Sequence, residues 1–580
     1  MQLQGAMIHS HDHSMEIADL VVLVGFLLGI SVYGFVKSRQ TTNNAREILV
    51  GSEISAFSVA LSVCSGYLSS ISLLGFPAEV YFYGGMILWF FIVYLIAFPL
   101  VAFVFLPVLH RLNTTSIYEY LERRFGYPCR LVATLLFCVQ TLLYNSVALY
   151  APSLALSSLT GIPLILSITL SAVLSAVYIS FGGAKAGIHT SAIQMLVIFA
   201  SMAVLVAIGL RNTTLQEVLS TAHNGHRLNL YDLRMDPRVR HSIWSVVIGG
   251  TGNVLCLFAS NQLSMQKYMV MKNLKDAQRV VLLNIPFNAF ILLTYVSTGL
   301  IVYQYYASCH PQLGSTNELL PRFVLDALSQ IPGIIGLFAA AIYSAGISTL
   351  SSSFAALSTL LISDATTSFN KGKIMRFDEK RAVTVARFLP IIFAFLTVGM
   401  AILCSKLKTI VLQISFIVFG AAGGPVLGSF VVGLFFKFVR GQAALAGIVS
   451  SILISFMVAI GSAVLKADPV QLPLVRDCKA ENITIASQMQ LPENYGYVKI
   501  NQFYGLENIF QVSYQYYSII GVLSNVIVSI IWQHCFGGSS SSCENVPDEL
   551  LSPMVRSKLQ PVESNEAEQN LMEKQAIDAV

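Results

Sequence analysis

The chain has 580 residues, of which 55% are hydrophobic and only 11% are charged, and its formal net charge is +5. Soluble domains carry about 25% charged residues, so this composition excludes an ordinary water-soluble protein. The small net charge gives no sign of a nucleic-acid-binding surface, and the nine cysteines include no CxxC pair typical of zinc or iron–sulfur sites. We therefore expect neither a nucleic-acid partner nor an organic cofactor.

Apolar stretches of helix length recur along the chain, and about thirteen of them are long enough to cross a bilayer core. Backbone amides in hydrocarbon must bond within their own segment, so these stretches are predicted to be helices. The fold class is therefore all-α, with an N-terminal segment 1–16, a transmembrane domain 17–535 and a disordered polar tail 536–580. The predicted spans, in chain order, are 17–37, 55–77, 83–107, 129–150, 158–181, 189–210, 243–263, 278–303, 333–363, 383–404, 409–437, 442–464 and 513–534.

Lysine and arginine gather in every second loop, for example at Lys37, Arg39 and Arg46 after the first span. Cytoplasmic loops carry such an excess, so we expect the N-terminus outside the cell, the C-terminus in the cytoplasm, and the chain in the plasma membrane. The last residue, Val580, gives the chain a small apolar C-terminus that a PDZ domain could bind, although most such termini bind none.

This orientation places two sequons and two cysteines outside the cell. Asn212 and Asn482 are then predicted to be glycosylated. Cys309 and Cys478 then face an oxidising environment. The two cysteines could form a disulfide there or remain as free thiols, and the sequence does not decide between these alternatives.

The ninth span carries a strip of small and hydroxyl residues. Ala345, Ser348, Thr349 and Ser352 fall at i, i+3, i+4 and i+7 and share one helix face. Neutral oxygens of this kind suit a hard cation, and sodium needs no carboxylate to neutralise its single charge. Small residues equally allow two helices to approach closely, so the spacing alone leaves both interpretations open.

The second and seventh spans are predicted to be broken helices. The second carries Ser65, Gly75 and Pro77, and the seventh carries Gly249 and Asn253 among several other interruptions. Unwound helices at corresponding places in two halves of a chain mark the midplane site of a transporter. The two spans are five apart, as an inverted five-helix repeat requires, while tolerated glycines at helix contacts are the alternative.

The spans contain few charged residues, which disfavours a proton relay through membrane carboxylates. No HExxH motif, intramembrane aspartate pair or convincing catalytic triad occurs, so we expect no enzyme activity.

From about residue 17 to residue 535 the chain resembles the solute:sodium symporter family, and within it the animal sodium-coupled monocarboxylate, multivitamin and iodide transporters. The order and spacing of several segments carry the resemblance. They are Pro77–Tyr81, Thr115–Phe125, Tyr150–Leu156, Gly182–Ala186, Asn261–Gln262 with Gln266–Tyr268, Ser348–Ser353 and Phe419–Pro425.

The resemblance implies a five-plus-five inverted-repeat core of the LeuT type, with one repeat over about 55–210 and the other over about 243–437. It also implies a sodium site between the second and ninth spans. By position, Ser348 and Thr349 would give hydroxyls, and Ala345, Ser65 and Leu68 would give backbone carbonyls.

Three departures from the family bear on the substrate and on coupling. Ser191 stands where the family usually has aspartate, although Gln194 is retained, so a second cation site at these two residues and the coupling ratio are in doubt. Ser72 stands where the iodide branch tends to have glutamine. The seventh span is apolar at Leu257 and Phe258, which disfavours a sugar because its hydroxyls would lack partners.

We therefore expect a sodium-coupled symporter for a small organic anion. The substrate would be a monocarboxylate or a carboxylate vitamin, bound near Ser69, Ser72, Leu257 and Phe258. An iodide symporter, or a sensor or ligand-gated channel that does not accumulate its ligand, is the alternative.

Overall fold

The computed structural model describes residues 15–38, 54–112, 114–211, 213–368, 379–406, 410–465, 469–475, 495–497, 505–536 and 546–555. In these ranges the chain is almost entirely helical. The α-helices, in chain order, are α1 Ile17–Ser38, α3 Ala56–Tyr67, α4 Ser70–Tyr83, α5 Phe90–Leu100, α6 Leu106–Arg111, α7 Glu119–Phe125, α8 Tyr127–Thr160, α9 Leu164–Gly209, α10 Leu215–Asn224, α11 Gly250–Phe258, α12 Gln262–Tyr268, α13 Leu274–Tyr305, α14 Leu319–Leu328, α15 Ile334–Ser368, α16 Glu379–Cys404, α17 Val411–Val418, α18 Gly424–Phe435, α19 Gly441–Val464 and α20 Tyr517–Phe536.

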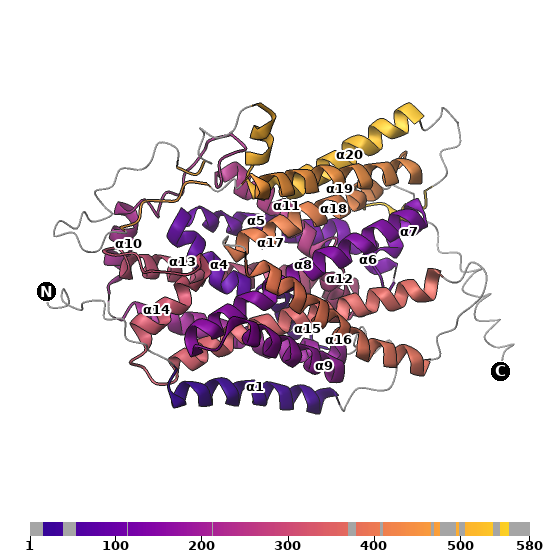
Figure 1. The fold of residues 1–580 in the computed structure, drawn as a ribbon. Coiled ribbons are helices and arrows are strands. Elements are labelled where there is room, and N and C mark those ends of the chain that lie inside the picture. Colours follow the sequence, from indigo (N-terminus) through magenta and orange to yellow (C-terminus); the bar gives the residue numbers. More distant parts are fainter. Residues whose placement is uncertain are drawn as a thin grey trace.

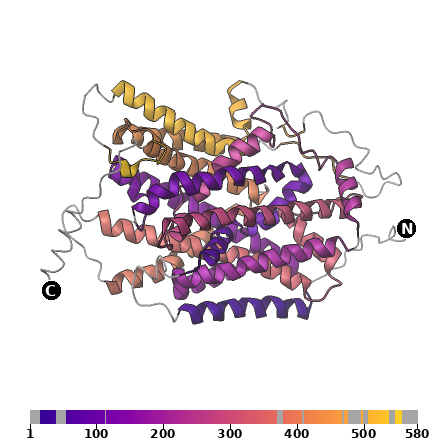
Figure 2. The same ribbon diagram turned by 180° about the vertical axis from the view of Figure 1, so that it is seen from behind.

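The long helices lie side by side in one bundle (Figures 1 and 2). Both views place α1 along one edge and the pair α19 and α20 along the opposite edge. The helices α3, α4, α8, α11 and α15 occupy the interior between these edges. Helix α15 is the most deeply buried of the long described helices, because 94% of the residues in its most apolar stretch are buried inside the protein. A hydroxyl-rich helix in that position faces other helices rather than lipid.

Among the described residues, nine helices are long and apolar enough to cross a membrane, and the number rises to eleven if each of two bent helix pairs is one span. Two shorter apolar helices, Leu164–Ala176 and Phe388–Cys404, lie within α9 and α16. The multi-pass all-α architecture is therefore confirmed, and the number of about thirteen spans stays a prediction.

Both bent pairs fall in the spans that the sequence predicts to be broken. Helices α3 and α4 meet at 61°, and the segment Ser245–Phe258 meets α12 at 60°. At each break a polar side chain caps the helix that follows. Ser69 Oγ accepts a hydrogen bond from the backbone amide of Ile71, and Asn261 Oδ1 accepts one from the backbone amide of Leu263. Such caps satisfy amides that a continuous helix would pair with its own carbonyls, so they stabilise the break.

The fifth and sixth predicted spans form one continuous helical element, α9. Ser171 Oγ lies 3.0 Å from Tyr343 Oη, and Ser348 Oγ donates to Ser191 Oγ at 2.9 Å. A straight helix would hold Ser171 and Ser191 about 30 Å apart, whereas their two partners lie within about 8 Å along α15. Helix α9 therefore turns back on itself, and its two halves lie against the same part of α15.

The predicted disorder of the tail, 536–580, is wrong for residues 546–555. Leu551 is fully buried, and the carbonyl oxygen of Leu550 accepts a hydrogen bond from Tyr120 Oη at 3.0 Å. Two adjacent leucines supply apolar surface that the polar composition of the segment conceals, and their burial against the bundle orders this stretch.

Candidate functional site

Three serine hydroxyls join α3, α15 and α9 beside the first break. Ser65 Oγ of α3 lies 2.8 Å from Ser348 Oγ of α15, which donates to Ser191 Oγ of α9 at 2.9 Å. The three side chains are at most 1% exposed. Hydroxyl oxygens from three helices therefore meet in one buried place, as the oxygen ligands of a small hard cation must.

The other residues predicted for the cation site lie on α15 and at the end of α3. Thr349 Oγ1 donates to the carbonyl oxygen of Ala345, one turn earlier on α15, at 3.0 Å. Leu68 follows the last residue of α3, and the last turn of a helix leaves backbone carbonyls without donors from that helix. The structure thus brings Ser65 and Ser348 together directly, whereas Leu68 is placed only by its position at the break.

The candidate second cation site contains one oxygen without a partner. Gln194 lies one turn after Ser191 on α9, and its Oε1 is buried with no hydrogen-bond partner among the described residues. A buried acceptor left unpaired costs about 1–3 kcal/mol. A cation beside Ser191 and Gln194 would satisfy that oxygen without a carboxylate.

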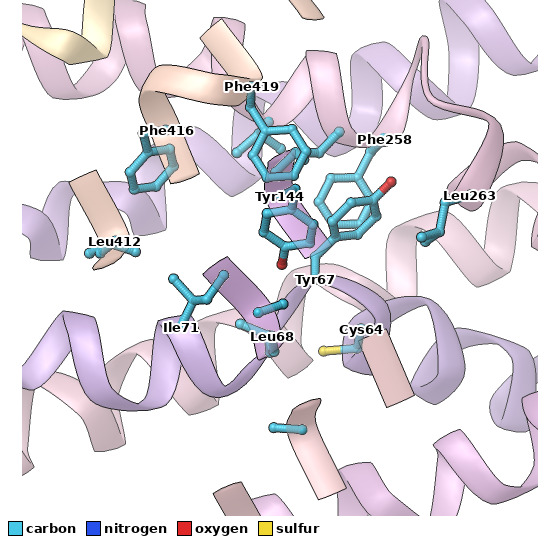
Figure 3. Packing of buried hydrophobic residues seen from close by; sticks show 14 of the residues in the cluster. Cys64, Tyr67, Leu68, Ile71, Tyr144, Phe258, Leu263, Leu412, Phe416 and Phe419 are labelled. Carbon is cyan, nitrogen blue, oxygen red and sulfur yellow. The ribbon is translucent and has the colours of Figure 1, made fainter. Parts of the chain in front are cut away.

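Four aromatic side chains form a cage beside the break between α3 and α4 (Figure 3). The cage consists of Tyr67, Tyr144, Phe258 and Phe419. The ring centroids of Tyr67 and Phe258 are 4.8 Å apart, those of Tyr67 and Phe419 6.3 Å, and those of Tyr144 and Phe419 4.5 Å. The rings come from α3, α8, α11 and the π-helical turn Phe419–Gly423, so the cage brings together both broken helices and two further spans.

Three of the four residues predicted to bind substrate lie at this cage. Ser69 Oγ accepts from Tyr144 Oη at 3.1 Å, Ser72 Oγ donates to the carbonyl oxygen of Tyr67 at 3.3 Å, and Phe258 supplies one of the rings. Both serine hydroxyls are therefore bonded to cage residues and buried at the start of α4.

Leu257 is buried in α11, and its carbonyl oxygen accepts from Ser264 Oγ at 2.9 Å. Sequence reasoning missed Tyr67, Tyr144 and Phe419. Aromatic residues inside apolar spans are ordinary core residues, so nothing local marks Tyr144, and Phe419 stands out only as the first residue of a segment that resembles the family. Only Tyr67 carried a signal, because it directly precedes the predicted break.

A buried ion pair lies at the other end of α4. Both carboxylate oxygens of Glu79 accept hydrogen bonds from the Arg240 guanidinium, at 2.7 and 2.9 Å. The Glu79 side chain is 0% exposed and the Arg240 side chain 3% exposed. Arg240 also donates to Gln413 Oε1 of α17 at 2.8 Å, and its guanidinium lies 4.0 Å from the ring centroid of Tyr83. The pair therefore ties α4 to the segment before the second broken helix and to α17.

The buried His241, next to this pair, is expected to make the folded protein less stable in acid. Burial lowers the pKa of His241 to about 4, against the opposing effect of Glu79. Below pH 6.5 the unfolded chain binds a proton at this residue and the folded chain does not, so stability falls as the pH drops from 6.5 towards 4, by about 2 kcal/mol at pH 5. Thermal unfolding of purified protein at pH 7 and pH 5 should show a smaller difference for His241→Gln than for the wild type. An identical difference in both would contradict the prediction.

The predicted modifications lie mostly outside the described residues, as Asn212, Asn482 and Cys478 all do. Cys309 is disulfide-bonded. The six other described cysteines are thiols, which leaves Cys478 and Cys543 as partners. The pairing with Cys478 stays a prediction.

The sequence is similar to known membrane transporters. Residues 48–450 match the family described as "Sodium:solute symporter family". The chain is 34% identical to sodium-coupled monocarboxylate transporter 2 of Homo sapiens, over 87% of this chain and 81% of the relative. It is also 34% identical to sodium-coupled monocarboxylate transporter 1 of Mus musculus, over 92% and 89% of the two chains.

A solved structure confirms the fold. The outward-open, substrate-bound state of a Na+-coupled sialic acid symporter superposes with a TM-score of 0.73 at 23% identity, covering 90% of this chain and 98% of that one. The five-plus-five inverted-repeat architecture is therefore confirmed. The chain belongs to the sodium:solute symporter family, and is a multi-pass membrane symporter that uses sodium as its coupling ion and is not an enzyme.

Proposed function

We propose that this chain imports a small organic anion together with sodium across the plasma membrane by alternating access. The substrate is a monocarboxylate or a carboxylate vitamin. The observation that carries the proposal is the contact of the Ser65, Ser348 and Ser191 hydroxyls between three helices at the break. Two relatives are named sodium-coupled monocarboxylate transporters, which supports a carboxylate over a sugar or a halide.

Sodium binds to oxygens of Ser65, Leu68, Ala345, Ser348 and Thr349. All five residues are buried and uncharged, so they can hold a monovalent ion without a carboxylate. Because the ligands come from α3 and α15, bound sodium holds the inner half of the first broken helix against α15. Inward movement of each net positive charge gains about 2.3 kcal/mol at a membrane potential of 100 mV.

The substrate binds in the aromatic cage, with its apolar part against Phe258 and neighbouring Leu257. Its carboxylate lies towards Ser69 and Ser72 at the start of α4, a helix of 14 residues. The N-terminal end of a helix carries partial positive charge and favours an anion. A sugar would leave several hydroxyls without partners among these rings.

A second cation site at Ser191 and Gln194 is a further part of the proposal. The unpaired Gln194 Oε1 supports it, and Ser191 already shares a hydrogen bond with Ser348. Occupation of both sites would make transport electrogenic for a monovalent anion, because two sodium ions would accompany one negative charge.

The orientation follows the positive-inside pattern, with the N-terminus outside and the C-terminus in the cytoplasm. Epitope tags at the two ends test it. Only an N-terminal tag should react with antibody in intact cells, and a C-terminal tag that reacts there would reverse the assignment.

An uptake panel tests the transport proposal. Cells expressing the chain take up radiolabelled lactate, nicotinate, biotin, iodide or glucose in sodium medium and in choline medium. We expect at least about tenfold more uptake of a carboxylate in sodium, because a tenfold gradient supplies about 1.4 kcal/mol per ion. Equal uptake in both media would refute sodium symport. Ligand-evoked current without tracer accumulation would instead indicate a channel or sensor.

A further inference from the structure

Lys267 is a buried lysine in the inner half of the second broken helix, α12. It is 6% exposed, and its Nζ donates to the carbonyl oxygen of Ser62 in α3 at 2.6 Å. No carboxylate of the described residues lies within ion-pair distance of Nζ, and Ser62 supplies its one hydrogen bond there. An ammonium has three donors, so two of them have no acceptor in this part of the protein.

The place of Lys267 in the fold ties it to the substrate path. Helices α3 and α12 are the halves of the two broken helices that lie on the same side of both breaks. Ser264 Oγ donates to Tyr67 Oη at 3.1 Å, so the two halves also meet at the cage. A Cβ at Gly66 would come within 3.0 Å of Lys267 Nζ, which shows that α3 leaves room for the ammonium there.

Other buried cations of the described chain have better partners. Arg240 has the carboxylate of Glu79, and Arg130 has that of Glu122 at 2.6 Å. Arg227 is also buried without an ion pair among the described residues, but its guanidinium donates hydrogen bonds to three backbone carbonyls, whereas Lys267 Nζ donates to one. Burying an ion without an opposite charge is strongly unfavourable. An ionisable residue inside a membrane domain therefore points to a substrate pathway and to a partner that is not part of the fold.

We propose that Lys267 is an anion-binding site on the cytoplasmic exit path, which receives the carboxylate of the substrate as it leaves the cage. The site rests on the proposed import of a carboxylate. When α3 separates from α12 on the cytoplasmic side, the bond to Ser62 breaks and the ammonium faces the opening path. The released ammonium then attracts the anion inward, while the sodium ligands on α15 lose their contact with α3.

Transport measured from the two sides of the membrane tests the site. Lys267→Met removes the charge and keeps much of the side-chain volume, and Lys267→Arg keeps the charge. Lys275→Met removes an exposed lysine from the start of α13 and serves as the matched control. Lactate, nicotinate and biotin are the probes, applied outside to intact cells and to the cytoplasmic face of inside-out vesicles.

We expect Lys267→Met to raise the cytoplasmic KM about tenfold or more and the extracellular KM less than about twofold, because one side alone uses the charge. Lys267→Arg should stay within about threefold of the wild type on both sides, and Lys275→Met should match the wild type.

Two results would overturn the proposal while the wild type still transports a carboxylate. An unchanged cytoplasmic KM in Lys267→Met would show that Lys267 does not bind the substrate anion. An equal rise on both sides would make Lys267 a structural link between α3 and α12. If Lys267→Met does not reach the membrane, Lys267→Gln replaces it under the same criteria. A wild-type chain with no sodium-dependent carboxylate flux would instead refute the transport proposal itself, and this site with it.

Discussion

Ser348→Ala is expected to reduce sodium-dependent uptake at least about tenfold and to raise the sodium concentration needed for half-maximal uptake by a similar factor. Ser348 is the middle member of the three hydroxyls, in contact with Ser65 and Ser191. The substitution removes one proposed sodium ligand and leaves two buried hydroxyls with one partner fewer. An unsatisfied buried group costs about 1–3 kcal/mol, so the lost contacts alone account for an effect of this size.

Ser344→Ala is the matched control for this experiment. Ser344 lies one turn earlier on α15 and is equally buried, but its Oγ donates to the carbonyl of Ala340 in the same helix at 2.7 Å. Its loss should change uptake less than about twofold, since a bond within one helix contributes little net stability. Surface biotinylation normalises both variants for the amount of protein at the membrane. If Ser348→Ala needed the same sodium concentration as the wild type for half-maximal uptake, Ser348 would not be a ligand of the proposed sodium site.

The broken helices could be predicted because their cause is local. The glycines, proline and serines of the second span weaken or cap a helix wherever they occur, and Ser69 and Asn261 indeed cap the halves that follow the breaks. The hydroxyl face of α15 could be predicted for the same reason, because a helix of known period places Ser348 and Thr349 on one side.

The convergence of distant segments could not be predicted from local pattern. Nothing near Ser191 in the sequence indicates that its hydroxyl meets Ser348, because the contact depends on the reversal of α9. The cage depends in the same way on α8 and on the turn that begins at Phe419. Local composition also concealed the packing of Leu551, since two leucines do not change the polar average of the segment.

Arg240→Met is expected to destabilise the protein by about 3–5 kcal/mol, because it breaks a buried ion pair. Glu79 is fully buried, and Arg240 is its bidentate partner at 2.7 and 2.9 Å. Removal of the guanidinium leaves a carboxylate in the interior without its charge partner, close to His241, whose burial opposes protonation. The measurement is the thermal unfolding of the purified protein in detergent, together with the amount of protein at the cell surface.

A double-mutant cycle separates the interaction between Glu79 and Arg240 from the cost of replacing either large side chain on its own. Glu79→Gln combined with Arg240→Met should cost less than the sum of the two single changes, because the second substitution removes the charge that the first has left unpaired. Arg238→Met is the control two residues away. Its ion pair with Asp236 is partly exposed, so its loss should cost less than about 1 kcal/mol. Additive costs in the cycle would mean that Glu79 and Arg240 do not stabilise each other, and that packing alone holds α4 to the segment before the second broken helix.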